Sequence, residues 1–256
     1  MPRNKKIVSM GRGGVGKTSF VALMTRYFIE AGETPLLLID ADPDQNLAEM
    51  VLGLTLMEAG KNTISEILYD ILDQGGSLTG IAPKDRIEGK IWGSGLYEGE
   101  AFDLMAIGTK WREGCYCLPN DVLKKLIPIT AENYRYTLID SPAGLEHLNR
   151  RITPEVDDVF DLLDPSRKSF GHVARAHRII KEIGIRYENI YLVGGYRFPE
   201  DLKDEAEKAT GLRYLGTITY DEEMADYILR GHSLLDLPSD SPAYLSVKGI
   251  MKEAGY

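Results

Sequence analysis

The stretch that decides the fold is Gly11-Arg12-Gly13-Gly14-Val15-Gly16-Lys17-Thr18. An apolar run, Ile7 to Met10, precedes it, and a helical pattern follows from Ser19. The pattern G-x-x-x-x-G-K-[ST] between a strand and a helix is typical of a loop that binds nucleotide phosphates. Its glycines let backbone amides turn toward a polyphosphate, and the helix adds the positive end of its dipole. A glycine-rich turn that binds nothing is the alternative, and the flanking strand and helix argue against it.

The residue types in this loop have separate tasks. Lys17 is expected to place its ammonium on the β- and γ-phosphates, and Thr18 to place its hydroxyl on Mg²⁺. The predicted phosphate site consists of Gly11, Gly13, Gly14, Val15, Gly16, Lys17, Thr18 and Ser19.

Two further apolar runs end in aspartate. Leu36 to Ile39 leads into Asp40 and Asp42, and a second run ends at Asp140. Ligands of open α/β sheets collect at the carboxyl ends of the strands, so these acids should face the phosphate loop. We expect Asp40 and Asp140 near the nucleotide and its Mg²⁺, and Asp42 to orient the attacking water. A solvated acidic turn is the alternative for the first pair. The amide of Gly144, four residues after Asp140, could sense a γ-phosphate.

Short β-rich runs alternate with helical patterns along the chain. This alternation predicts an α/β fold with a mainly parallel sheet flanked by helices on both faces. The expected strands are Lys6 to Met10, Pro35 to Asp40, Phe102 to Gly108, Tyr136 to Asp140, Asp158 to Leu163, Asn189 to Gly195 and Tyr214 to Ile218. The expected helices are Lys17 to Ala31, Ile64 to Asp73, Asp121 to Thr130, Arg167 to Ile183, Glu200 to Thr210, Glu222 to Arg230 and Ala243 to Ala254. We predict one domain over residues 1–256, with a glycine-rich surface excursion at about 75–100.

The composition limits the partners. Hydrophobic residues make up 43% of the chain, which fits a globular core. Thirty basic and 39 acidic residues give a formal charge of −9, which disfavours non-specific binding to nucleic acid or anionic lipid. No apolar stretch reaches the roughly 18 residues of a membrane span, and the first residues do not resemble a signal segment. We therefore expect a cytoplasmic protein without a nucleic-acid or membrane partner.

Cys115 and Cys117 are the two cysteines of the chain. Two thiolates are too few for a closed tetrahedral metal site, but a two-fold dimer would bring four together. Such a set suits Zn²⁺ or Ni²⁺. Reduced cysteines without a ligand role and an intersubunit disulfide are the alternatives. Among the histidines we single out His147, which is expected to serve as a structural hydrogen-bonding residue, with relay of the nucleotide state to the dimer face or transient ligation of a metal as the alternatives.

The combination of [KR]-G-G-V-G-K-T with a D-x-D-P strand end resembles the deviant Walker A ATPases, which include the nitrogenase iron protein, ParA and MinD. The segments Gly114-Cys115-Tyr116-Cys117 and Ala143-Gly144-Leu145-Glu146-His147 are similar to the CooC-type nickel-insertion ATPases. This resemblance implies a homodimer that hydrolyses ATP to ADP and phosphate with Mg²⁺, carrying Ni²⁺ or Zn²⁺ on Cys115 and Cys117 between the subunits. It implies carbon monoxide dehydrogenase or acetyl-CoA synthase as the recipient of the metal.

Three positions depart from that class. Arg12 stands where the class has a signature lysine that contacts the partner's nucleotide, and the planar guanidinium is not equivalent to an ammonium. The segment Val193 to Arg197 lacks the asparagine that holds adenine, and Ile218-Thr219 replaces an Ile-Pro turn. Base recognition is therefore expected to be looser. The alternative function is a ParA- or MinD-like ATPase that organises DNA or membrane, and it would need basic surface residues.

Overall fold

The computed structural model of the chain describes residues 4–73, 88–109, 117–143 and 155–256. Within them, eight strands form one sheet in the order β3-β4-β2-β5-β1-β6-β7-β8. Strand β3 runs antiparallel to β4, and every other neighbouring pair is parallel. The prediction of a mainly parallel sheet is confirmed.

The strands are β1 (Lys5–Gly11), β2 (Leu36–Asp40), β3 (Tyr97–Glu98), β4 (Phe102–Ala106), β5 (Tyr136–Asp140), β6 (Asp158–Leu163), β7 (Asn189–Gly194) and β8 (Arg213–Thr217). The α-helices are α1 (Lys17–Glu30), α2 (Asn46–Leu52), α3 (Ile64–Asp73), α5 (Cys117–Ala131), α7 (Arg167–Glu182), α8 (Lys203–Thr210), α9 (Glu222–Arg230) and α10 (Pro242–Glu253). Short helical turns are η1 (Ile91–Gly95), η2 (Glu200–Leu202) and η3 (Leu234–Asp236).

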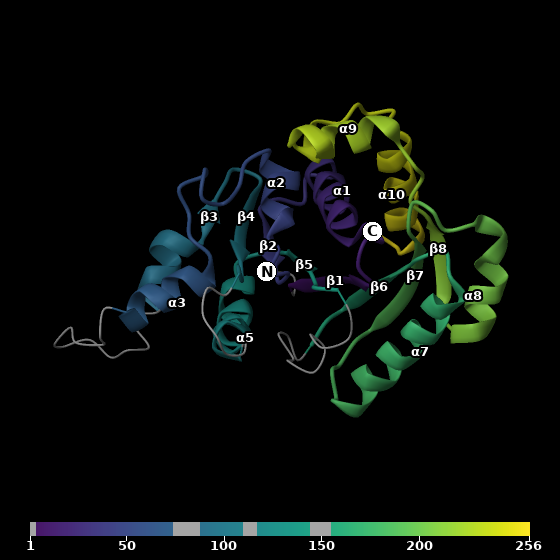
Figure 1. The fold of residues 1–256 in the computed structure, drawn as a ribbon, viewed down its shortest axis with the longest axis horizontal. Coiled ribbons are helices and arrows are strands. Elements are labelled where there is room, and N and C mark those ends of the chain that lie inside the picture. Colours follow the sequence, from purple (N-terminus) through teal and green to yellow (C-terminus); the bar gives the residue numbers. More distant parts are fainter. Residues whose placement is uncertain (1–3, 74–87, 110–116, 144–154) are drawn as a thin grey trace.

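Helices cover both faces of the sheet (Figure 1). Alternate side chains of a strand point to opposite faces, so Ile7 and Leu38 join the core cluster that contains α1, α2 and α10. Val8 and Ile39, one residue further on, join the cluster that contains α3, α5 and α7. The central strands β2 and β5 are buried at every position, as expected for parallel strands between two helical layers.

Local sequence explains several helix ends. Gly32, Gly184 and Gly211 follow α1, α7 and α8 with φ near +70°, a conformation that glycine adopts without strain. Asp221 stands directly before α9 and caps it, because its side chain accepts hydrogen bonds from the backbone N–H groups of Glu223 and Met224.

Some sequence predictions need correction. The helix expected at Asp121 already begins at Cys117, and the one expected from Glu200 is divided into η2 and α8. Helix α2 was not predicted. The excursion expected at 75–100 is partly regular, because its later residues form η1 and the edge strand β3. Residues 74–87 lie outside the described part of the chain. Among the described helices, none combines the length and apolar character needed to cross a bilayer.

Candidate functional site

The phosphate loop joins β1 to α1 at the carboxyl edge of the sheet (Figure 1). Gly11, Gly14 and Gly16 have φ values of 140°, 74° and 96°. A Cβ on Gly11 would lie 2.6 Å from the carbonyl oxygen of Leu162, so only glycine fits there. The loop leads directly into the first turn of α1, and the N-terminus of a helix is a ready-made anion site.

Lys17 and Thr18 already contact polar groups of this edge. The Lys17 Nζ donates a hydrogen bond to the carbonyl oxygen of Arg12 over 3.1 Å. The Thr18 Oγ1 donates to Oδ2 of Asp140 over 2.7 Å. Burial lowers the pKa of Lys17, and Asp140 is the strongest of the neighbouring carboxylates that raise it. Both side chains thus hold positions from which they could exchange an internal partner for a phosphate or a cation.

Asp140 has the properties of a cation ligand. Its Oδ1 is buried without a hydrogen-bond partner. Burial raises the pKa of Asp140 to about 7, while the bond from Thr18 and the charge of Lys17 lower it. A buried carboxylate oxygen without a partner costs free energy unless a ligand satisfies it. The Thr18 hydroxyl and the Asp140 carboxylate therefore fit a divalent cation such as Mg²⁺.

Asp40 and Asp42 differ in their surroundings. Asp40 pairs in register with Asp140 on the adjacent strand, and it accepts hydrogen bonds from the backbone N–H groups of Asp42 and Leu47. Burial and the charge of Asp140 raise the pKa of Asp40 well above its usual range. Asp40 thus fixes the turn and the start of α2. Asp42 is half-buried near Lys17, which leaves it the better placed of the two for a reacting water.

Arg12 is bound within its own chain. Its guanidinium donates to Oδ2 of Asp164 and, over 3.4 Å, to the hydroxyl of Ser166. The Ser166 hydroxyl donates in turn to Oδ1 of Asp164. Ser166 is the residue before α7, so this network ties the phosphate loop to the beginning of that helix.

Sequence reasoning missed a third buried carboxylate. Asp161 lies on β6 opposite Met10 of β1 and is 2% exposed. Burial raises its pKa to about 7, although the charge of Lys17 lowers it, and its Oδ1 has no partner. The signal was present as a lone charge in the apolar run from Val159 to Leu163.

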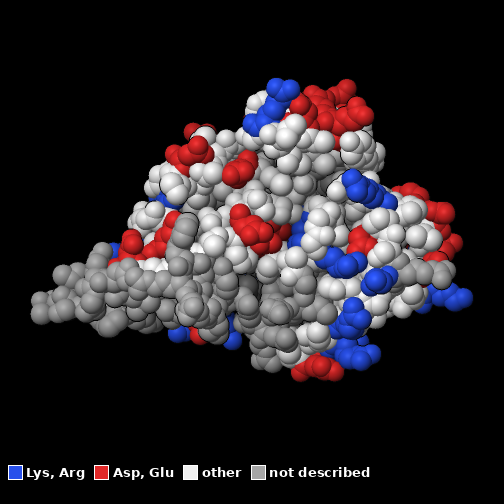
Figure 2. Space-filling model, viewed as in Figure 1, with Lys and Arg blue, Asp and Glu red and all other residues white. Residues whose placement is uncertain are grey.

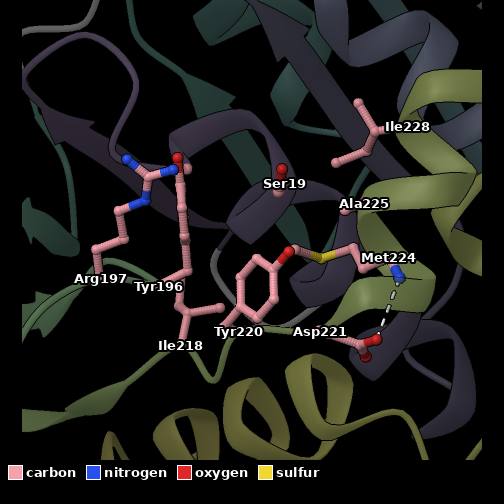
Figure 3. Close-up of a pocket in the computed structure, with 10 residues that line it drawn as sticks. Ser19, Tyr196, Arg197, Ile218, Tyr220, Asp221, Met224, Ala225 and Ile228 are labelled. Carbon is pink, nitrogen blue, oxygen red and sulfur yellow. Dashed lines mark hydrogen bonds between the residues drawn. The ribbon is translucent and has the colours of Figure 1, made fainter.

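A cavity of about 330 Å³ lies beside the phosphate loop, and Figure 3 shows the side chains that line it. Tyr196 and Tyr220 approach each other on one side, with ring centroids 6.4 Å apart and planes at 41°. Met224 and Ile228 of α9 close the other side. Most of the lining is aromatic or aliphatic, and its polar side chains are those of Ser19, Arg197 and Asp221, with no side-chain amide among them. The aromatic and aliphatic part suits the flat, apolar face of a nucleotide base.

Of the other residues predicted for the site, the structure describes some and leaves others outside the described ranges. Val15 is buried, Ser19 contacts the sulfur of Met50 over 3.7 Å, and Gly13 lies near Ala143. Cys117 is the first residue of α5 rather than part of an extended segment. Cys115, Gly144 and His147 lie outside the described residues. Within the described ranges, no group of three or more His, Cys, Asp or Glu side chains forms a metal cluster.

Comparisons with known proteins agree with this geometry. Residues 6–234 match the family model of the CobQ/CobB/MinD/ParA nucleotide binding domain. An uncharacterized ATP-binding protein of Methanocaldococcus jannaschii is 34% identical over 249 residues, which cover 96% of this chain and 97% of that protein.

Two other proteins are similar at lower identity. The carbon monoxide dehydrogenase accessory protein CooC of Rhodospirillum rubrum is 26% identical over 255 residues, covering 93% of this chain and 91% of that protein. The cell division ATPase MinD of Pyrococcus furiosus has a similar structure, with a TM-score of 0.70 at 18% identity over 97% of this chain and 98% of that one.

Proposed function

The chain belongs to the CobQ/CobB/MinD/ParA nucleotide-binding family, and on that premise we propose that it is a MgATP-hydrolysing dimeric switch that serves as a metallochaperone. The observation that carries the ATPase part is the Thr18–Asp140 hydrogen bond beside Lys17, with one buried oxygen of Asp140 left without a partner. A P-loop NTPase needs a hydroxyl and a carboxylate for its cation at this place. Thr18 and Asp140 would hold Mg²⁺, which would neutralise the charge that develops on the phosphates.

The chain's own side chains divide the remaining work. Lys17 leaves the Arg12 carbonyl and places its ammonium on the β- and γ-phosphates, where it holds the nucleotide and stabilises charge. Asp42 accepts a hydrogen bond from the attacking water and orients it. Arg12 leaves Asp164 and reaches the nucleotide of the partner subunit in a dimer, where its charge acts as an arginine finger. The cavity between Tyr196 and Tyr220 holds the base by stacking.

The metallochaperone part rests on the similarity to CooC and on the Cys-x-Cys sequence at Cys115 and Cys117. Two subunits would supply four thiolates, a soft ligand set that suits Ni²⁺ as cargo and also takes Zn²⁺. Closing the dimer on ATP and opening it after hydrolysis would change the thiolate geometry and hence the metal affinity. Carbon monoxide dehydrogenase or acetyl-CoA synthase is the proposed recipient.

A second candidate is an ATPase that organises DNA or membrane, as members of the same family include MinD and ParA. The exposed cations of α7 supply some of the positive surface charge that such a protein needs, although α8 beside them is acidic. The overall charge of −9 speaks against it.

The test combines metal titration of the reduced protein with its mass in solution and its rate of phosphate release from ATP. The proposal expects one nickel per two chains, an affinity that MgATP changes, and loss of metal but not of ATP hydrolysis in Cys115→Ser/Cys117→Ser. Lys17→Ala is the matched control, since it should lose nucleotide binding and keep the metal. Metal binding that persists without both cysteines, or no metal binding at all beside a nucleotide-driven dimer, would reject the metallochaperone role. Absence of ATP hydrolysis in the unmodified chain would reject the ATPase role.

A further inference from the structure

Helix α7 carries a row of basic side chains along its solvent face. The exposed cations of α7, here named the α7 stripe, are Lys168, Arg175, Arg178 and Lys181. Gly171 and Ala174 lie between them and are also exposed, so the space between the cations is free of bulky side chains. At a rise of 1.5 Å per residue, the stripe extends for about 20 Å. Figure 2 shows the basic side chains following the line of α7 on this face of the molecule.

None of these four cations forms an ion pair within the described part of the chain. Seven other basic residues do: Arg12, Arg26, Arg135, Arg186, Arg213, Arg230 and Lys248. Exposed lysines on other helices, such as Lys125 and Lys203, are also without an ion pair in the described chain, so the four are set apart by lying together on one helix. In a protein of charge −9, such a row of uncompensated positive charge has no role in holding the fold together.

The pKa values of two histidines on α7 are sensitive to the electrostatic potential around this helix. Burial lowers the pKa of His172, and the nearby charges of Arg175 and Arg12 lower it further. The pKa of His177 is lowered by burial and by Lys181. Burial is the larger cause for both histidines, and the cations of α7 act in the same direction. The far end of α7 also carries the exposed acid Glu182, next to Lys181.

The stripe lacks an apolar component. The hydrophobic side of α7 is already buried, with Phe170, Val173, Ala176 and Ile180 packed against the sheet and α8. The exposed large hydrophobic residues of the described chain all lie on other elements. A helix that inserts into a membrane surface needs an unpartnered apolar face, which α7 does not offer.

We propose that the α7 stripe is a docking surface for an acidic patch on a partner protein. The charges are complementary, the length of about 20 Å matches a side of a small protein interface, and a cationic rim steers an acidic partner toward the site. The α7 stripe is also bounded, because acidic side chains of α8 gather beside it (Figure 2).

That boundary argues against a nucleic acid. A duplex presents one negative charge per about 1.7 Å along its whole length, and its charge would extend past the stripe onto α8. Asp204, Glu205 and Glu207 would then face phosphates, and the excess negative charge of the chain would add to the repulsion. A discrete acidic patch can match the stripe and avoid these residues.

The test measures binding of three polyanions to the nucleotide-free protein, so it does not depend on ATP hydrolysis or on metal. The probes are a fluorescent 20-residue poly-glutamate peptide, a labelled 30-base-pair DNA duplex and vesicles with phosphatidylserine. The test variant replaces Lys168, Arg175, Arg178 and Lys181 by Gln. The control variant makes the same change in charge elsewhere, at Lys125, Lys203, Lys208 and Lys252, which are exposed on other helices.

We expect poly-glutamate to bind the unmodified protein in a salt-dependent way. Its affinity should fall roughly tenfold in the stripe variant, because four exposed charge contacts are lost, and about twofold or less in the control variant. Circular dichroism and the melting temperature must match the unmodified chain in both variants. Equal losses in both variants would overturn the proposal, since only the net charge would then matter. Tighter binding of DNA or of the vesicles than of poly-glutamate would overturn it in favour of those partners, and so would no binding to any probe.

Discussion

Asp161 offers a prediction that the structure makes quantitative. Its carboxyl has a pKa of about 7 in the folded chain, against 3.8 for the unperturbed group. Between these values the folded state holds one proton more than the unfolded state, so stability falls as the pH rises. At 1.36 kcal/mol per pKa unit, the cost reaches about 4 kcal/mol at pH 7 and stays constant above it. Asp161→Asn cannot ionise, and the variant should therefore gain stability over the unmodified chain as the pH rises from 4 to 7.

The assay is urea unfolding at several pH values from 4 to 8, followed by circular dichroism. The two proteins should be nearly equal at pH 4, and the variant should be more stable by up to about 4 kcal/mol at pH 7, a figure that already includes the attraction of Lys17 for the Asp161 carboxylate. Asp240→Asn, at an exposed position, makes the same chemical change without burial and should show no such trend. A difference between Asp161→Asn and the unmodified chain that stays within about 0.5 kcal/mol across this range would refute the reasoning.

Three further predictions concern the nucleotide edge. Gly11→Ala should lower stability by roughly 2 kcal/mol or more in thermal unfolding, because φ is +140° and the new Cβ meets a backbone oxygen, whereas Gly171→Ala in open space should not. Asp164→Asn should tighten ATP binding about two- to fivefold, because phosphate no longer competes for Arg12; nucleotide titration should show no such gain in an Arg12→Ala background. Tyr220→Ala should weaken ATP and GTP binding about equally, by roughly tenfold, and a loss confined to one nucleotide would contradict recognition by stacking.

The fold was predictable where local sequence and burial agree. The β-rich apolar runs that include Leu36 to Ile39 and Tyr136 to Ile139 have the composition of buried parallel strands, and their bounds differ little from those observed. Helix α2 was not predictable, because it has seven residues and its start is fixed by the side chain of Asp40. Strand β3 has only two residues, and it is extended because it pairs with β4. A contact between two parts of the chain therefore determines this strand, and no local pattern predicts it.

For the site, the sequence predicts which residues meet at the carboxyl edge of the sheet. The strand ends at Asp40 and Asp140 and the loop before α1 fall together because all parallel strands end on the same side. Their separate roles depend on contacts made in the fold, as with Asp40, whose oxygens are taken by backbone N–H groups. The aromatic pair Tyr196 and Tyr220 is 24 residues apart in sequence, and no local pattern connects it.

The nucleotide edge and the α7 stripe share a structural element. Arg12 of the phosphate loop bonds to Asp164 and Ser166, and Ser166 stands directly before α7. A polyphosphate that draws Arg12 away would leave Asp164, at the start of this cationic helix, with the Ser166 hydroxyl but without the guanidinium. Thermodynamic linkage then requires that a partner docked on the α7 stripe and a nucleotide on the loop influence each other, provided that either ligand binds the two arrangements of Arg12 unequally. Arg12, at the position of a signature lysine, thus connects the phosphate loop to the start of the helix that carries the α7 stripe. Its planar guanidinium can satisfy an aspartate and a hydroxyl at once, where an ammonium offers no such fork.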